Sequence, residues 1–288
     1  MRFFPFFLCV YFTVMTESSP YRLSYQFQPQ DTRDYMFQLV DAGNGIDKNT
    51  VVITPKTKIT LGTSKSTTPT LYNVPNLSPI LDQGSVGDCV ANAFAFIISM
   101  QTKGYIKPSR LFHYCNSRIL DDTTLSDDAG TYIRTACTAI SREGVCQETV
   151  WPYITSNFNV FPPLEVYKAS NRFKTFTYVF VAQDLNTLKA CLTTNQKPII
   201  FGFLVYSSFM TQSVASNGQV PLPNTHTETL QGGHCMNIVG FNDTTQRFTC
   251  ANSWGTRWGD KGFCYLPYAY LTNPQLASDF CYTTFVGF

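Results

Sequence analysis

Four residues whose side chains could together carry out acyl transfer occur along the chain in the order Gln83, Cys89, His234 and Asn252. A thiol needs a base to become a nucleophile, and His234 could take the proton of Cys89 and later pass it to a leaving amine. The imidazole needs a partner that fixes its tautomer, and the side-chain oxygen of Asn252 could accept its N–H. The amide of Gln83 could then stabilise the negative oxygen of an intermediate.

The sequence around Cys89 predicts a buried helix that begins at the cysteine. Gly84 and Gly87 mark a loop, Asp88 is a good N-cap residue, and an almost continuous apolar run follows from Val90 to Met100. We therefore expect a helix from Asp88 to about Gln101, buried on most sides. A cysteine in its first turn would lie where free backbone amides and the helix dipole favour a thiolate.

The histidine and the asparagine lie in a part of the chain that is rich in strand patterns. Gly232 and Gly233 precede His234, an apolar strand continues to Phe241, and Asn252 ends the next strand candidate. Further helices are expected at 108–120, from 133 to just before 144, and at 184–194. Strands are expected at 198–206, 233–241, 247–252, 262–266 and 280–285, and loops at 54–70 and 217–229. The fold class is thus α+β, with a mainly helical half, a β half and a cleft between them.

The residues so far fall into three blocks that resemble, in order, the motif blocks of papain-like cysteine proteases: Gln83-Gly84-Ser85-x-Gly87-x-Cys89, Gly233-His234, and Asn252-Ser253-Trp254-Gly255-x-x-Trp258-Gly259-x-x-Gly262. The resemblance covers about residues 25–288. Other stretches are more similar to the compact prokaryotic and viral branch than to the cathepsins: Asp82–Ala93, Pro108–Phe112, Glu143–Cys146 with Trp151–Tyr153, and Pro267–Leu271.

The resemblance implies a papain-like two-lobe fold, with a helical lobe at about 82–165, an antiparallel β-barrel-like lobe at about 170–288, and the active-site cleft between them. It also implies roles for single residues. Cys89 would be the nucleophile, His234 the base and Asn252 its orienting partner, while Gln83 and the Cys89 amide would form the oxyanion hole. Trp254 would shield the His–Asn hydrogen bond, and the expected substrate contacts are Gly130, Gly233 and Trp254. Asp127 or Asp128, if it faces the cleft, would favour basic substrate side chains.

Three residues near Cys89 depart from the cathepsin pattern. Val86 stands where cathepsins have a cysteine, so their disulfide beside the nucleophile cannot form, and Val90 replaces a tryptophan. Asp88 places a carboxylate next to the thiol; as an N-cap it would stabilise the helix by about 1 kcal/mol, and its charge would slightly oppose thiolate formation.

Composition limits the classes of partner. The net charge is +2, and charged residues make up only 14% of the chain, so no nucleic-acid partner is expected. Ten cysteines without a C-x-x-C pair, together with three histidines, give no support to a structural zinc site. A reaction through an acyl-thioenzyme would need no metal and no organic cofactor. Reduced buried cysteines and some disulfides both remain open. We expect protein or peptide substrates and a monomer.

The N-terminus allows three interpretations. Residues 1–24 are treated as an extension before a catalytic domain at 25–288. Arg2 and the apolar run from Phe3 to Met15 have the length of a signal peptide and are too short for a membrane span. If residues 1–18 are a signal peptide, the protein would be secreted or endolysosomal. A start at Met15 would instead give a cytosolic protein, and any prosegment would have to lie within residues 16–75.

Two other functions remain open beside a cysteine peptidase. One is a catalytically silent papain fold that serves as a binding protein, although the four expected catalytic residues are all present. The other is a transferase on the same scaffold, which would pass the acyl group to an amine or a thiol instead of water.

Overall fold

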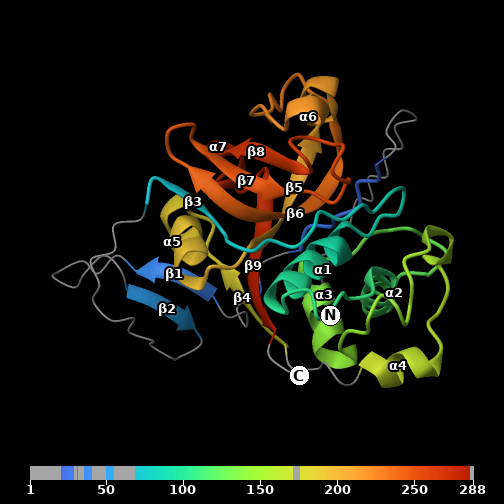
Figure 1. The fold of residues 1–288 in the computed structure, drawn as a ribbon. Helices are drawn as coiled ribbons and strands as arrows, with labels where there is room; N and C mark the ends of the chain where they lie inside the picture. Colours follow the sequence, from blue (N-terminus) through green and yellow to red (C-terminus); the bar gives the residue numbers. More distant parts are fainter. Residues whose placement is uncertain are drawn as a thin grey trace, which may run out of the picture.

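The structure is a computed structural model that describes residues 21–28, 31, 36–40, 50–54, 69–170 and 176–285. Residues 1–20 of the expected extension at 1–24, and nearly all of the expected loop at 54–70, lie outside the described residues. Helices α1 to α4 lie together beside one large sheet, which is the expected α+β arrangement (Figure 1).

Helices α2 and α3 follow the apolar periodicity of the sequence, whereas α1 follows a nearly continuous apolar run. Four match the expected ones, and three short ones were not expected. Their bounds are α1 Cys89–Gln101, α2 Arg110–Leu120, α3 Ile133–Glu143, α4 Leu164–Ser170, α5 Leu185–Asn195, α6 Gln212–Asn217 and α7 Tyr268–Leu271. Helix α2 begins two residues later than expected, because Ser109 is its N-cap and accepts a hydrogen bond from the Phe112 amide at 3.1 Å. Helix α3 ends before Gly144, whose φ of 73° stops the helix.

The strands of the described residues form one sheet of nine. Their bounds are β1 Met36–Val40, β2 Thr50–Thr54, β3 Leu71–Asn73, β4 Phe176–Val181, β5 Ile199–Tyr206, β6 Leu230–Asn242, β7 Arg247–Ala251, β8 Phe263–Pro267 and β9 Ala277–Phe285. The strand order is β2-β1-β4-β9-β5-β6-β7-β8, and β3 pairs with β6. All pairs are antiparallel except β1 with β4. Between its described strands the sheet is open, so the expected barrel-like lobe is corrected to an open, twisted sheet.

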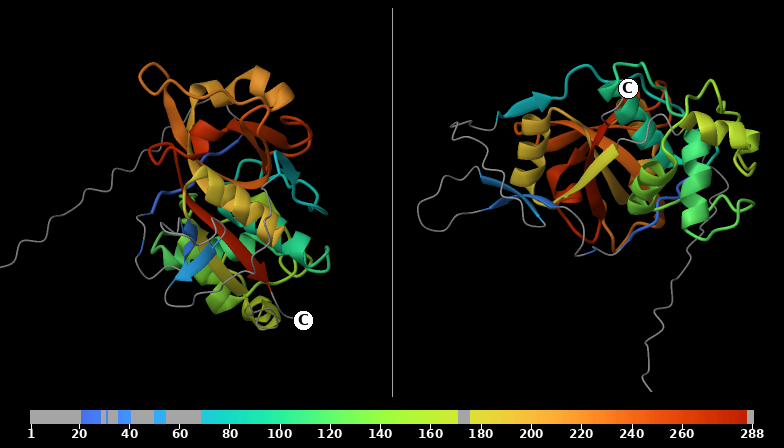
Figure 2. Two further views of the ribbon diagram at one scale, coloured as in Figure 1. Left: turned by 90° about the vertical axis from the view of Figure 1, so that its left-hand side faces the viewer. Right: turned by 90° about the horizontal axis from the view of Figure 1, so that it is seen from below.

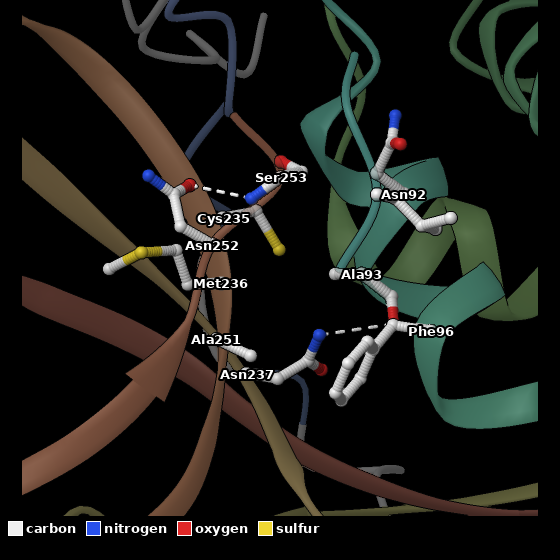
Figure 3. Close-up of a pocket in the computed structure, with 10 residues that line it drawn as sticks. Asn92, Ala93, Phe96, Cys235, Met236, Asn237, Ala251, Asn252 and Ser253 are labelled. Atoms are coloured by element: carbon white, nitrogen blue, oxygen red, sulfur yellow. Dashed lines mark hydrogen bonds between the residues drawn. The ribbon is translucent and has the colours of Figure 1, made fainter. Parts of the chain in front are cut away.

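Two large apolar clusters hold the fold. One lies among the strands β5 to β9, and the other joins α1 and α3 to the sheet. Helix α1 is buried from Cys89 to Ile98, which explains why its apolar run shows little periodicity. Figure 3 shows this helix against β6 and β7, where the Asn237 amide donates to the Ala93 carbonyl at 3.3 Å. The helical half is therefore fixed directly to the strands that carry the histidine.

The described cysteines settle one open alternative. All nine of them, from Cys89 onwards, are free and buried. They pack as small apolar side chains, because a neutral thiol fits a close-packed interior. None of the helices in the described part of the chain is both long and apolar enough to cross a membrane.

Candidate active site

Cys89 is the first residue of α1, as expected, and it is completely buried. Burial raises the pKa of its thiol to about 12, although the backbone of Cys235 and the hydroxyl of Ser24 favour the thiolate. The helix N-terminus alone was expected to lower this pKa. In this state the loss of water around the sulfur outweighs the dipole, since an unsolvated thiolate is unfavourable.

Asp88 stands at the N-cap of α1, but its side chain does not cap the helix. Its Oδ1 instead accepts hydrogen bonds from Asn92 at 2.8 Å and from the Tyr153 hydroxyl at 2.9 Å. Burial raises the pKa of this carboxyl to about 8. The expected cap is therefore wrong. The raised pKa of Asp88 weakens the expected repulsion on the thiolate, although Asp88 still contributes to the raised pKa of Cys89.

His234 and Asn252 come together on two neighbouring strands of the sheet. His234 lies on β6, opposite Phe203 of β5, and Asn252 directly follows β7, so the pairing of β6 with β7 brings them side by side. The imidazole Nε2 lies 2.8 Å from the Asn252 Oδ1. Because that oxygen can only accept, Nε2 carries the proton and Nδ1 is left as the basic nitrogen. Burial lowers the pKa of His234 to about 4.

Aromatic rings cover the His–Asn pair. Trp254 is 2% exposed and stacks on His234, with ring centroids 4.8 Å apart. Tyr21 stacks on Trp254 at 4.4 Å. The indole thus keeps water from the imidazole, which is the position expected of a shield.

Gln83 is held in place by a residue that the motif contains but sequence reasoning passed over. The Ser253 hydroxyl donates to the Gln83 Oε1 at 2.6 Å, and the Gln83 backbone amide donates to the Ser253 carbonyl at 2.9 Å. With its oxygen fixed, the Gln83 side chain directs Nε2 to the carbonyls of Val86 at 2.9 Å and Arg22 at 3.3 Å. The only sequence signal for Ser253 was its place between Asn252 and Trp254.

Residues 21–28 (blue in Figure 2) contact the helical half at Gly87 and Asp128 and the sheet at Gly233. Any prosegment was expected within residues 16–75, but the place of this segment beside the nucleophile was not foreseen. Ser24 Oγ donates to the Gly87 carbonyl at 2.5 Å and lies 4.0 Å from the Cys89 sulfur. The Tyr25 amide donates to the Gly233 carbonyl at 2.9 Å. The segment therefore covers the nucleophile and pairs with the residue next to His234.

The two glycines expected to contact substrate contact this segment instead. A Cβ on Gly130 would overlap the Ser24 carbonyl, and one on Gly233 would overlap the Tyr25 carbonyl. The absence of side chains at both positions therefore leaves a groove into which an extended backbone fits.

Asp128 also faces the segment. Its carboxylate lies 3.1 Å from the Arg22 guanidinium and accepts hydrogen bonds from the Gly87 amide and from the Tyr114 hydroxyl. Asp127 accepts from Thr124 and is exposed. Arg22 of the segment thus lies next to Asp128, and the expected preference for basic substrate side chains stays a prediction.

Val86 and Val90 take the places of the cathepsin cysteine and tryptophan without leaving a gap. Val86 packs with Ala91, Leu111 and Tyr114, and Val90 belongs to the cluster between α1 and the sheet. The helix that carries Cys89 is therefore fixed by apolar packing.

Comparison with known proteins decides the family. A model described as "Papain family cysteine protease" matches residues 70–284. The chain belongs to this family. It is accordingly a cysteine protease, a hydrolase of peptide bonds.

Similar proteins and solved structures indicate the branch of the family to which the chain is most similar. An "Uncharacterized peptidase C1-like protein" of Acanthamoeba polyphaga mimivirus is 36% identical over 73% of this chain and 71% of its own length. Xylellain, a cysteine protease from Xylella fastidiosa, has a TM-score of 0.78 and 29% identity, over 95% of this chain and 100% of that one. A procathepsin B of Trypanosoma congolense has a TM-score of 0.58 and 17% identity, over 77% of this chain and 79% of that one, and shares the fold. The greater similarity to viral and bacterial proteins confirms the predicted branch.

Proposed function

We propose that this papain-family protease uses Cys89 as its nucleophile, His234 as the base, Asn252 as the residue that orients it, and Gln83 with the Cys89 amide as the oxyanion hole. The observation that carries this assignment is the 2.8 Å contact between His234 Nε2 and Asn252 Oδ1. It leaves Nδ1 as the proton acceptor, and Nδ1 is buried with no hydrogen-bond partner among the described residues.

The reaction then runs in two balanced steps. The Cys89 thiol gives its proton to His234 and the sulfur adds to the peptide carbonyl, whose electron pair moves onto oxygen near the Gln83 amide. The C–N bond breaks, the amine leaves with the proton from His234, and an acyl-thioenzyme remains. Water, deprotonated by His234, then cleaves the thioester and restores the thiol.

The described state is closed, and residues 21–28 must leave the cleft before a substrate can bind. The support is that Cys89 and His234 are both 0% exposed under this segment. The same burial raises the pKa of the thiol and lowers that of the imidazole, so that both groups are neutral. Opening the cleft would restore water to both and allow the thiolate–imidazolium pair to form.

The test is cleavage of a denatured protein substrate by the full chain and by Cys89→Ala, each after the cleft has been loosened by Tyr25→Ala. We expect fragments only with the cysteine present, and labelling of Cys89 by an epoxysuccinyl probe. Cleavage that survives Cys89→Ala would overturn the mechanism. Labelling without cleavage would favour the silent binding protein, and products ending in an amide or a thioester instead of an acid would favour the transferase.

The boundary at residue 25, the monomeric state and the lack of a nucleic-acid partner stay predictions. Light scattering behind a sizing column tests the monomer directly, and a gel-shift assay with mixed-sequence DNA and RNA tests the last.

A further inference from the structure

The Tyr153 hydroxyl lies between two acceptors next to the catalytic residues. It is 3.0 Å from the backbone carbonyl of Gln83 and 2.9 Å from the Oδ1 atom of Asp88. Gln83 carries the side-chain amide of the oxyanion hole, and Asp88 directly precedes Cys89. Both acceptor residues are 0% exposed, so bulk water does not compete for them. One hydroxyl therefore joins the loop that carries Gln83 to the start of the helix that carries the nucleophile.

The Gln83 carbonyl depends on this hydroxyl for its position. The carbonyl also accepts a hydrogen bond from the Val86 amide, but that contact is longer, at 3.3 Å. On the other side of the residue, the Gln83 amide donates to the Ser253 carbonyl at 2.9 Å. Turning the carbonyl would turn the backbone from which the Gln83 side chain projects. Because catalytic groups lose rate when they are displaced by as little as 1 Å, we expect the reaction to be sensitive to this contact.

A buried guanidinium holds the Tyr153 ring in place. The Cζ atom of Arg110 lies 3.4 Å from the centre of the ring, and such a contact is stronger when it is shielded from water. Arg110 also donates to the backbone carbonyl of Asp82 at 2.9 Å and forms two hydrogen bonds of 2.9 Å with the Glu148 carboxylate. Since Asp82 precedes Gln83, one side chain of α2 fixes both the ring and the loop that the ring contacts.

The Asp88 carboxyl sits in surroundings that disfavour its charge. The charged and titratable groups that act on it come from four parts of the chain: Arg110, Tyr153, Asp128 and Cys89. Arg110 favours the ionised form but is itself paired with Glu148, and Asp128 opposes ionisation. The Oδ2 atom of Asp88 is buried with no hydrogen-bond partner among the described residues. Burial raises the pKa of Asp88 to about 8, so the carboxyl is neutral below this pH and ionised above it.

The two acceptors compete for a single proton. A tyrosine hydroxyl has one hydrogen and donates it to one acceptor at a time. A peptide carbonyl competes well with a neutral carboxyl, so the Gln83 carbonyl keeps the donor while Asp88 is protonated. An ionised carboxylate is the stronger acceptor, because a hydrogen bond to a charged oxygen is about twice as strong as one between neutral groups. Ionisation of Asp88 therefore turns the hydroxyl away from Gln83.

We infer that Tyr153 is a positioning residue of the oxyanion hole, which holds the Gln83 carbonyl while Asp88 is neutral and releases it when Asp88 ionises. This inference rests on the proposed function and adds to it a further residue and a dependence on pH. Tyr153 touches neither the substrate nor the reacting atoms, so its effect on the rate passes through Gln83.

The experiment uses the full chain with Tyr25→Ala as the parent, which opens the cleft, and a peptide that this parent cleaves. Adding Tyr153→Phe should lower kcat about tenfold at pH 6 with little change in KM. At pH 9.5 the ratio of the two kcat values should fall to about one, because the parent has then also lost the contact to Gln83. In a background with Asp88→Asn, which imitates the neutral carboxyl, the ratio should stay at about ten at both pH values.

The matched control is Tyr167→Phe, which removes a tyrosine hydroxyl that also donates to an amide oxygen, that of Asn116 at 2.9 Å. It should leave kcat unchanged at both pH values. A ratio of one at pH 6 would overturn the positioning role of Tyr153, and a tenfold ratio that persists at pH 9.5 would overturn its control by Asp88.

Alkylation separates positioning from general damage to the fold. The reaction of Cys89 with iodoacetamide forms no oxyanion, so Tyr153→Phe should alkylate at the parent's rate at pH 6 although its kcat is lower. If kcat and the alkylation rate fall together, Tyr153 supports the helix start as a whole and the inference is wrong.

If the parent cleaves no peptide, the proposed function fails, but the position of the Gln83 amide can still be measured with a peptide aldehyde. The Cys89 sulfur adds to the aldehyde carbon, and the thiol proton passes to the aldehyde oxygen, which takes the place of the oxyanion. Protection of Cys89 from iodoacetamide then reports binding. Tyr153→Phe should need about ten times more aldehyde than the parent at pH 6, and equal protection would refute the inference.

Discussion

Replacing Tyr25 by alanine should expose Cys89 by weakening the segment that covers it. Tyr25 is 4% exposed in the closed state, and it becomes solvated when the segment leaves. Replacing a buried aromatic residue by alanine costs about 3–5 kcal/mol. Taking about 3 kcal/mol, and about 1.4 kcal/mol for each factor of ten, the open population should rise about a hundredfold.

Alkylation by iodoacetamide measures that population. Cys89 is 0% exposed, so the reagent reaches it only from the open state, and its rate follows the open fraction as long as the segment moves faster than the reagent reacts. Peptide mapping by mass spectrometry separates Cys89 from the other thiols. Cys115 and Cys137, buried in α2 and α3, should remain unlabelled and show that the variant is folded.

The matched control is Tyr105→Ala, which removes a tyrosine that is 70% exposed and should leave the labelling rate of Cys89 unchanged. If Tyr25→Ala labels no faster than the wild type while Cys115 stays protected, the segment does not control access to the nucleophile. That result would refute the closed-state assignment.

Three further predictions concern the site and its stability. Asn252→Ala removes the 2.8 Å contact to His234 and should lower kcat/KM about tenfold to a hundredfold, since a buried donor left unpaired costs about 1–3 kcal/mol; a rate within twofold of wild type would contradict it. Ser253→Ala removes the hydrogen bond to the Gln83 amide oxygen and should lower kcat with little change in KM. The loss should be smaller than the roughly hundredfold loss in kcat expected for Gln83→Ala. Equal losses in the two variants would show that Ser253 does not act by positioning Gln83. Burial lowers the pKa of His113 to about 4, below its unfolded value, so its neutral form supports the fold above about pH 6.5 and this support is lost as the pH falls towards 4. Relative to His113→Gln, the wild type should therefore lose up to about 3 kcal/mol of unfolding free energy over that range. Chemical denaturation at several pH values measures this, and an equal loss of unfolding free energy in the two proteins would refute it.

The parts of the fold that the sequence predicted are those with strong local patterns. Helix α1 follows a nearly continuous apolar run, α2 and α3 combine apolar periodicity with start or stop residues, and β5 and β6 carry long apolar runs. His234 and Asn252 were expected from their side-chain chemistry and from motifs at two neighbouring strand candidates, and they lie only 18 positions apart. In each case the information lies within a few tens of residues of sequence.

What escaped prediction depends on contacts between distant residues. The hydroxyl of Tyr25 donates to the carboxylate of Asp279, which is 254 positions away. No pattern within residues 21–28 predicts this contact. The local sequence predicts Asp88 as an N-cap, but its side chain accepts hydrogen bonds from Asn92 and Tyr153 and makes none to the helix end. Strand β4 pairs with β1, near the start of the chain, and with β9, near its end. Its position in the sheet is therefore set by these distant partners and could not be predicted from its own six residues.

The stacking of Tyr21, Trp254 and His234 gives the molecule an optical reporter of its own. Trp254 lies between a ring of the cleft segment on one side and the imidazole on the other. When the segment leaves, one face of the indole meets water, and its fluorescence should shift to longer wavelength at the moment the thiol becomes reactive. Opening of the cleft can thus be followed in real time on the unlabelled protein.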